Sequence, residues 1–378
     1  MLFRSGPPAW TQLTSSGTPP SARYSHSAIY DPGRDRMVVF GGGNSISPYY
    51  LNDVWALSLA GPPAWTQLIP SGTLPTARDL HSAIYDPVRD RMVVFGGHDG
   101  TNGRNDVWAL SLAGTPAWTQ LTPSGTPPSA RYDHSAIYDP VRDRMVVLGG
   151  YSSSYLNDVW ALSLAGTPVW TQLTPSGTPP IARIFHSAIY DPVRDRMVVF
   201  GGYSGSYLLN DVWALSLAGT PAWTQLIPSG TPPTTRDLHS AIYDPVRDRM
   251  LVFGGGYYDG GRFNDVWALE WSYTPPGAVV DPEAQPLVSC LRPPAPNPTR
   301  GTTAVSYALA QAGRVQLGVY DVSGRLVRQL VDGERRAGAE TVVWNGMAES
   351  GTRLQAGVYF VRLAAPGFRE TRRVILLK

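Results

Sequence analysis

Apolar and polar positions repeat along most of the chain at spacings of 52 to 55 residues. The phrase His-Ser-Ala-Ile-Tyr-Asp-Pro opens five copies, at His26, His81, His134, His186 and His239. Arg-Asp-Arg-Met, an apolar run ending in Gly-Gly, Asn-Asp-Val-Trp-Ala-Leu and, in all but the last copy, Trp-Thr-Gln-Leu follow it. These runs are rich in β-branched, aromatic and aliphatic residues, so a full copy predicts a four-stranded antiparallel sheet. Because so small a sheet cannot bury its own faces, we expect the copies to stack on one another.

The third copy shows how turn residues separate these strands. Asp139 and Pro140 begin a turn, because Pro presets φ and Asp bonds its own backbone. Gly149 and Gly150 permit positive φ and a close approach of neighbouring chain. The strands of this copy are predicted at residues 134–139, 145–148, 158–164 and 170–173.

The repeat resembles the kelch repeat, whose period near 50 residues, paired glycines and downstream tryptophan are all present. The resemblance covers about 270 residues and implies a β-propeller with one sheet per blade around a central channel. Ten of the twelve tryptophans occupy two positions of the repeat, and we expect them to pack between blades. They are Trp55, Trp108, Trp160, Trp213 and Trp267 in the third strand, and Trp10, Trp65, Trp118, Trp170 and Trp223 in the fourth.

Strand counting predicts how this propeller closes. The chain begins with a solitary fourth strand at Trp10, and the last copy ends with its third strand, at Trp267. Pairing the two would complete a fifth blade and leave no open edge. The prediction is therefore an all-β chain with a closed five-bladed kelch β-propeller at residues 1–272. Kelch relatives commonly have six or seven blades, so the alternative is a longer protein with further blades ahead of Met1.

A second domain is predicted after a proline-rich linker at residues 273–285. Residues 286–378 contain six short runs with strand character, and Val315, Leu317 and Val319 alternate with polar neighbours as one buried face requires. Six or seven strands in some 90 residues predict a small immunoglobulin-like β-sandwich. The runs are residues 303–309, 314–322, 325–331, 341–344, 358–363 and 372–377.

Four phrases in this domain are similar to a known family: residues 297–300, 319–325, 344–346 and 356–360. They resemble the carboxy-terminal sorting domain of type IX secretion substrates, itself related to the Ig-like domain of flagellar hook-capping proteins. Relatives usually have Asp where Asn345 stands. The resemblance implies a secreted bacterial protein at the outer-membrane surface or outside the cell, whose residues 286–378 contact the secretion machinery. The alternative is an ordinary stabilising sandwich. The amino terminus lacks a secretory signal, which a misplaced start would explain.

Composition excludes several classes of protein. The 39 glycines and 35 prolines leave no stretch longer than 15 residues free of both, which excludes coiled coils, helical bundles and membrane-spanning helices. A net charge of +2 gives no overall field to attract nucleic acid. Cys290 is the only cysteine, so no internal disulfide and no cysteine-based metal site is possible. We expect a monomer without a cofactor.

No catalytic or metal site is identifiable from these motifs. Five equivalent histidines spread around a channel are not expected to bind one ion, because metal–nitrogen bonds of about 2.1 Å require close convergence. Asp133, His134 and Ser135 are consecutive in a strand, so His134 cannot face both neighbours as in a catalytic triad. Copper oxidases built on kelch propellers use a cysteine joined to tyrosine, whereas Cys290 lies outside the repeats. Residues 99–102 lack calcium-loop spacing and predict a turn.

A binding face is better supported. In an up-and-down sheet, alternate loops emerge at the same end. The loops between the second and third strands therefore share a face with the loops that join the fourth strand to the next sheet. Both sets of loops vary between copies, whereas the strands that carry them are nearly constant. Tyrosines dominate them, which suits sugar rings or protein surfaces. The candidate ligand-binding residues are Arg23, Tyr24, Tyr50, Arg78, Asp79, Arg131, Tyr132, Tyr155, Arg183, Phe185, Tyr207, Arg236, Asp237 and Tyr258. For the five arginines, the alternative is a structural role, bonding loop carbonyls or the aspartate of Asn-Asp-Val-Trp.

The leading hypothesis is a noncatalytic recognition protein that binds a glycan or protein partner through this tyrosine-rich face. One alternative is a glycan-modifying enzyme that uses Asp and Arg in the same funnel, although Asp79, Asp133, Asp237 and Asp259 lie in different copies. Another is a scaffold with no ligand, whose loops drift neutrally.

Overall fold

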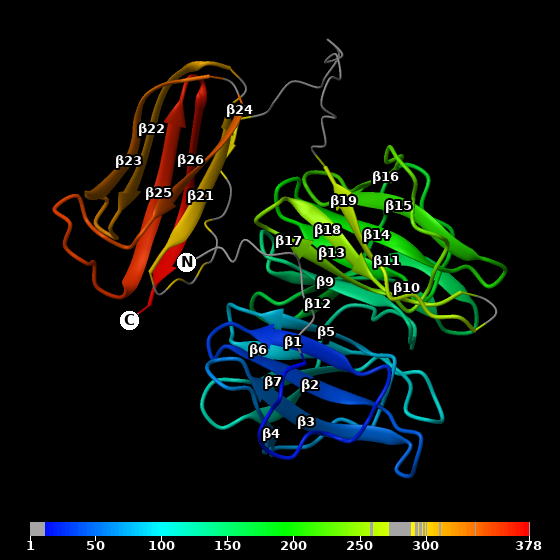
Figure 1. The fold of residues 1–378 in the computed structure, drawn as a ribbon. Coiled ribbons are helices and arrows are strands. Elements are labelled where there is room, and N and C mark those ends of the chain that lie inside the picture. Colours follow the sequence, from blue (N-terminus) through cyan, green and yellow to red (C-terminus); the bar gives the residue numbers. More distant parts are fainter. Residues whose placement is uncertain are drawn as a thin grey trace. The chain divides into compact units, whose positions relative to one another are not determined.

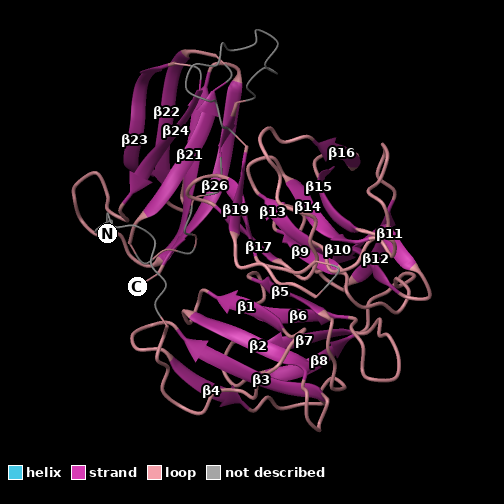
Figure 2. Cartoon of the chain, turned by 45° about the vertical axis from the view of Figure 1, so that its right-hand side comes forward, coloured by secondary structure: helices cyan, strands magenta, loops and turns pink. Residues whose placement is uncertain are grey.

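The computed structural model describes residues 12–257, 260–271, 289–291, 294, 297, 299, 301–309, 311–336 and 338–377. This described part is all β and contains no helix that could cross a membrane. The chain forms two compact units: residues 1–243 with 249–269, and residues 244–248 with 270–378. Figure 2 shows the strands of both units.

The repeats fold into five antiparallel sheets with strands in chain order. Sheets 1 to 4 have four strands and sheet 5 has three described strands. The strands are, in sheet 1, β1 (Ser27–Asp31), β2 (Arg36–Gly43), β3 (Tyr50–Ser58) and β4 (Ala64–Leu68); in sheet 2, β5 (Ser82–Asp86), β6 (Arg91–Phe95), β7 (Val107–Ser111) and β8 (Ala117–Leu121); in sheet 3, β9 (Ser135–Asp139), β10 (Arg144–Tyr151), β11 (Tyr155–Ser163) and β12 (Val169–Leu173); in sheet 4, β13 (Ser187–Asp191), β14 (Arg196–Tyr203), β15 (Leu208–Ser216) and β16 (Ala222–Leu226); in sheet 5, β17 (Ser240–Asp244), β18 (Arg249–Phe253) and β19 (Val266–Glu270). The first strands of sheets 1 to 4 lie side by side, near the middle of the unit in Figure 1.

Apolar cores between neighbouring sheets hold the blades together. Between sheets 1 and 2, Phe40 lies 4.8 Å from Trp118, measured between ring centroids, and Trp108 is buried in the same core. Equivalent cores join sheets 2 and 3 and sheets 3 and 4. The predicted interblade role therefore holds for the six tryptophans of these cores: Trp108, Trp118, Trp160, Trp170, Trp213 and Trp223.

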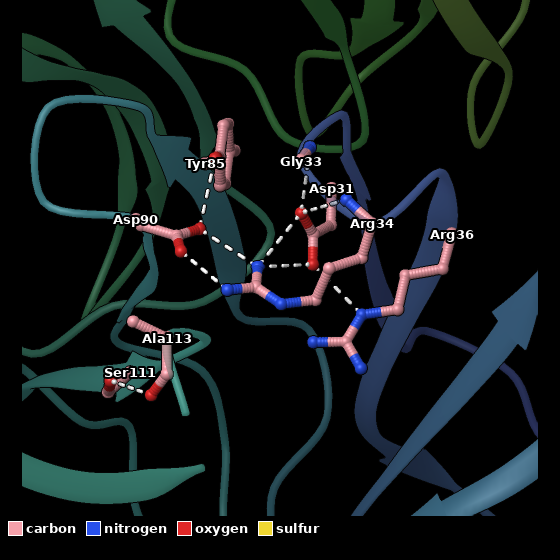
Figure 3. A network of polar contacts seen from close by, with 8 residues as sticks. All are labelled: Asp31, Gly33, Arg34, Arg36, Tyr85, Asp90, Ser111 and Ala113. Atoms are coloured by element: carbon pink, nitrogen blue, oxygen red, sulfur yellow. Dashed lines mark hydrogen bonds and ion pairs between the residues drawn. The ribbon is translucent and has the colours of Figure 1, made fainter. Parts of the chain in front are cut away.

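Ion pairs also join the sheets, at the turns after the first strands. The buried Asp31 carboxylate accepts hydrogen bonds from Arg34 and Arg36, and Arg34 also donates to Asp90 of sheet 2 at 2.6 Å (Figure 3). The Tyr85 hydroxyl donates to the same Asp90. The pattern repeats between sheets 2 and 3 and between sheets 3 and 4. The conserved spacing within Asp-Pro-x-Arg-Asp-Arg thus serves contacts between blades as well as a turn.

Closure of the ring is not seen in the described residues. Trp10 lies outside them, and Gln12 and Leu13, which the prediction pairs with β19, are not in a strand. Among the described residues β19 pairs with β18 alone, and no hydrogen bond joins sheet 1 to sheet 5. The five-bladed closure therefore stays a prediction.

The second unit contains two sheets around a single core. One sheet has the order β20 (Cys290–Leu291), β21 (Thr303–Leu309), β24 (Gly338–Trp344), and the other has β23 (Leu326–Arg335), β22 (Gly313–Tyr320), β25 (Gly357–Ala365), β26 (Phe368–Leu376). Val315, Leu317 and Val319 are fully buried, as their alternation predicts. Trp344 is also buried, and its indole N–H donates to the Met347 carbonyl at 3.0 Å. The arrangement agrees with the predicted Ig-like sandwich.

Candidate functional site

Two families of loops meet at one end of the sheets. The segment before each first strand forms backbone bridges with the segment after the paired glycines: Tyr24 with Gly43, Asp79 with His98, Tyr132 with Tyr151, Ile184 with Tyr203 and Asp237 with Gly256. Glycine is needed here because the chains approach closely. A Cβ on Gly97, whose φ is +96°, would lie 2.6 Å from the Asp79 carbonyl oxygen. The di-glycine of the repeat thus brings both variable segments onto one face.

One non-glycine residue per sheet has a left-handed backbone at this face, immediately before each histidine. The N–H of Leu80 donates to the Ser25 carbonyl at 3.0 Å, and the N–H of Asp133 donates to the Leu80 carbonyl at 3.0 Å. Phe185 and Leu238 continue the chain of bonds from sheet to sheet. Positive φ is unfavourable for such residues, so the bonds hold a strained segment in place, a feature that is common at functional sites.

Six aromatic rings form a continuous series across sheets 1 to 4, which we name the aromatic arc. Neighbouring ring centroids are 5.2–6.0 Å apart, within the range of favourable aromatic pairs. The rings belong, in order, to Tyr50, His98, Tyr132, Tyr151, Tyr155 and Tyr203. The arc joins side chains from four separate copies into one surface.

Two buried carboxyl groups accompany the arc. Asp79 is 6% exposed and adjoins His98 through the backbone, and Asp133 is 9% exposed and follows Tyr132. Oδ1 of Asp79 is buried without a hydrogen-bond partner. Burial and, second, the neighbouring charge of Asp79 raise the pKa of Asp133 to about 8. Burial also raises the pKa of Asp79. The structure thus brings together two acids that the sequence assigned to separate copies, and Asp133 retains a proton at neutral pH.

The five predicted arginines do not reach this face, because their side chains are buried in the frame. Arg78 forms two hydrogen bonds with the Asp106 carboxylate, at 2.6 and 2.8 Å, and a third with the Gly96 carbonyl. Burial alone would raise the pKa of Asp106, but the bonds and charge of Arg78 outweigh it and hold the pKa below its ordinary value. Arg23, Arg131, Arg183 and Arg236 make the same pairs with Asp53, Asp158, Asp211 and Asp265. The geometry supports the structural alternative for these arginines.

The histidines next to the first strands also have a structural role, because they join neighbouring sheets. His81, His134, His186 and His239 are buried, and each shares a hydrogen bond of 2.8–2.9 Å with a serine of the preceding sheet. Burial lowers the pKa of His81 and of His134 to about 3, so both are neutral at physiological pH. His134 bonds Ser82 rather than Ser135, so its neighbours do not form a triad. The described residues contain no group of three or more potential metal ligands.

The remaining candidates are distributed over the same loops. Tyr24 and Tyr207 are exposed, and neither forms a ring contact with the arc. Phe185 and Asp237 are half-buried, and burial raises the pKa of Asp237 although Arg262 opposes the shift. Tyr258 lies outside the described residues. Asp99 accepts backbone hydrogen bonds from Thr101 and Asn102, as expected of a turn.

His98 belongs to the aromatic arc but is not among the predicted site residues. It directly follows the paired glycines, at the position that Tyr151 and Tyr203 occupy in later copies. That shared position is the signal that identifies all three residues. The candidate list also lacks Tyr151 and Tyr203, which the structure places in the arc.

Comparison with known proteins identifies both units. The family model described as the KLHDC2/KLHL20/DRC7 Kelch-repeats domain matches residues 3–188, 114–272 and 165–304. The FlgD Ig-like domain matches residues 297–367. The solved structure of YjhT matches with a TM-score of 0.52 at 14% identity, covering 95% of this chain and 99% of that one, which is a likeness of fold.

Curated relatives are much longer proteins. The Drosophila melanogaster leucine-zipper-like transcriptional regulator 1 homolog is 33% identical over 50% of this chain and 20% of its own length. The Caenorhabditis elegans host cell factor homolog hcf-1 is 30% identical over 64% of this chain and 32% of its own length. Human host cell factor 2 is 29% identical over 65% of this chain and 32% of its own length. The chain thus matches about a fifth to a third of these relatives.

Proposed function

The chain belongs to the kelch-repeat family, and from that premise we propose that its propeller is a recognition module that binds a partner protein through the aromatic arc. Kelch propellers often serve protein binding, and the arc offers six neighbouring rings on one face. Tyrosine gives broad amphipathic contact at low entropic cost. The observation that carries the proposal is the pairing of this arc with two buried acids, Asp79 and Asp133, since Oδ1 of Asp79 is buried without a hydrogen-bond partner.

The acids favour a basic group on the partner. A buried carboxyl without a hydrogen bond is unfavourable, and a lysine or arginine side chain would supply both donors and opposite charge. The neighbouring rings add cation–π attraction for the same group. A glycan remains a second class of ligand for the arc, since tyrosine rings also suit sugar rings.

For the second unit we propose export and attachment at the surface of a bacterial cell. The support is the match to an Ig-like domain together with the phrases shared with type IX sorting domains. Secretion of a reporter fused to residues 286–378 tests this proposal, with the Ig-like unit lacking its final strand β26, residues 368–376, as the control. A reporter retained inside a host that has a type IX system would contradict it.

One observation favours an enzyme as the alternative. Asp133 holds a proton near neutral pH beside a second carboxyl, and two carboxyls with separate ionisation are the groups that glycoside hydrolysis requires. Asp133→Asn separates the two functions. Loss of all turnover with binding retained would indicate catalysis, and absence of turnover on a broad glycan panel would favour recognition alone.

The recognition proposal is tested by capture on peptide and glycan arrays. Tyr155→Ala and Tyr132→Ala are expected to weaken capture at least tenfold, because each removes a central ring of the arc. Tyr30→Ala is the matched control, because Tyr30 is an exposed tyrosine whose hydroxyl bonds Asp35 at the turn after the first strand. Equal capture by Tyr155→Ala and Tyr30→Ala would reject this placement of the site.

A further inference from the structure

The Ig-like unit is strongly cationic. Residues 286–378 contain 13 basic and 6 acidic side chains, whereas the whole chain has a net charge of only +2. Twelve of these 13 basic side chains are arginines. Arginine binds phosphate and carboxylate groups through two parallel hydrogen bonds. The place of these arginines on the sandwich therefore determines what the unit can contact.

Three of the arginines share the outer face of the sheet that contains β23, β22, β25 and β26 (Figure 1). Alternation with the buried Val361 and Val374 directs Arg362 and Arg373 to this face, and Arg369 continues the same alternation. The strand register makes Arg369 and Arg373 the diagonal neighbours of Arg362, at about 7–8 Å. All three are exposed, and we name them the arginine cluster.

No ion pair joins the arginine cluster to an acid in the described part of the chain. Asp332 of the same sheet pairs with Arg314 at 3.1 Å, and Glu334 lies opposite the same Arg314 in the strand register. Glu370 pairs with Arg372. Three neighbouring positive charges are therefore left for an external anion.

The arginine cluster is not needed to protect the edge of β26. Exposed charges often prevent pairing at a free strand edge. Here the side chain of Asn297 donates to the Arg373 carbonyl and accepts from the Ile375 N–H, both at 2.8 Å. The Thr299 N–H donates to the Ile375 carbonyl at 2.9 Å. Because the unit itself occupies this part of the edge, the charges call for another explanation.

Apolar side chains gather beside the arginine cluster on the same face. A Cβ added to Gly318 would lie 2.6 Å from Cδ1 of Leu326 and 3.2 Å from the Tyr320 ring, so both side chains cover this glycine. Gly318 lies opposite Arg362, whose guanidinium carbon is 4.5 Å from the centroid of the Tyr320 ring. Leu326 is 44% exposed, and Val322 in the adjoining turn is 76% exposed.

We propose that this face docks on an anionic lipid surface. The arginine cluster binds lipid phosphates, and Val322, Leu326 and Tyr320 enter the boundary between headgroups and acyl chains. Asp321 in the turn is compensated by Arg325 at 3.2 Å. A polyanion in solution would neutralise the arginines but leave the exposed valine and leucine in water, whereas a lipid surface accounts for both. This inference goes beyond the proposed export, because lipid binding requires no secretion system.

Sedimentation of the full chain with vesicles tests the proposal. We expect binding to vesicles of phosphatidylglycerol and phosphatidylcholine in equal parts, and little binding to phosphatidylcholine alone. An arginine near an anionic membrane contributes about fivefold to partitioning, so Arg362→Gln, Arg369→Gln and Arg373→Gln together should lower binding about 100-fold. Arg314→Gln is the matched control, and a far smaller change is expected because Asp332 already compensates this charge. The three arginines are exposed, so thermal unfolding of the triple variant should be unchanged.

A fluorescent label on Val322→Cys in a Cys290→Ser background separates a lipid from other anions. Its emission should shift to shorter wavelength on anionic vesicles but not with dextran sulfate, and a label on Val88→Cys, an exposed valine of a propeller turn, should not shift. Binding to dextran sulfate without binding to vesicles would overturn the proposal in favour of a polyanion in solution. Absence of vesicle binding, or vesicle binding that the triple variant retains, would also overturn it. None of these results depends on whether the reporter fused to residues 286–378 is secreted.

Discussion

Ser135 Oγ lies 2.8 Å from Nε2 of His186, and this hydrogen bond joins the first strands of sheets 3 and 4. The same pair recurs at the three other junctions between consecutive sheets. Each histidine is followed directly by the serine that bonds the next histidine, so the series runs from Ser27 to His239. At its two ends His26 and Ser240 are exposed and have no hydrogen-bond partner among the described residues.

Ser135→Ala is expected to lower the free energy of unfolding by about 1–3 kcal/mol, because it leaves Nε2 of buried His186 without a partner. Nδ1 of the same ring already lacks one. Urea unfolding followed by tryptophan fluorescence measures the change. Ser111→Ala is the control, since the side chain of this half-buried serine bonds only the Ala113 carbonyl in a solvent-exposed hydrogen bond, and a change within about 0.5 kcal/mol is expected. Equal losses in the two variants would show that the Ser–His bond adds nothing to stability.

Arg78→Ala is expected to be far more damaging than the removal of a surface arginine. It leaves the Asp106 carboxylate without the two hydrogen bonds of its partly buried pair, for which a loss of about 3–5 kcal/mol is typical. Arg247 pairs with Asp244 on the surface, so Arg247→Ala should cost less than about 1 kcal/mol. Thermal unfolding of both variants gives the comparison. A folded Arg78→Ala protein with unchanged capture of a ligand would also confirm that this arginine acts on the frame.

Local sequence predicted the blades well because each copy carries its own strand and turn signals. The sequence did not decide the role of the five arginines, because each pairs with an aspartate 27 to 30 positions away. The hydrogen-bond acceptors of such an arginine can belong either to a ligand or to the protein itself. The same arginine and aspartate recur in every copy beside variable neighbours, and this constancy was the sequence signal for a structural role. The coupling of Asp79 to Asp133 depends on how adjacent sheets pack, which no single copy encodes.

Asp133 makes stability depend on pH. Its pKa is raised from 3.8 to about 8 in the fold, so the folded protein retains a proton that the unfolded chain has lost. This contribution to stability is fully present below about pH 4 and is lost as the pH rises through about 8. Asp133→Asn keeps a neutral side chain of similar shape, so stability should decline less between pH 5 and pH 8.5. Urea unfolding at both values checks this, and identical declines in the two proteins would contradict the raised pKa.

The same proton should compete with a basic ligand, so affinity for a tetralysine peptide is expected to increase as the pH rises from 6 to 8. Binding of an ammonium group favours the ionised carboxylate, and the gain approaches tenfold per pH unit below the pKa and flattens above it. Calorimetry at several pH values measures the effect, with a tetraglutamate peptide as the control that should not bind. Asp133→Asn should remove the pH dependence, whereas Tyr155→Ala should weaken binding equally at every pH. Affinity of the unsubstituted protein that does not change between pH 6 and pH 8 would exclude Asp133 from the binding site.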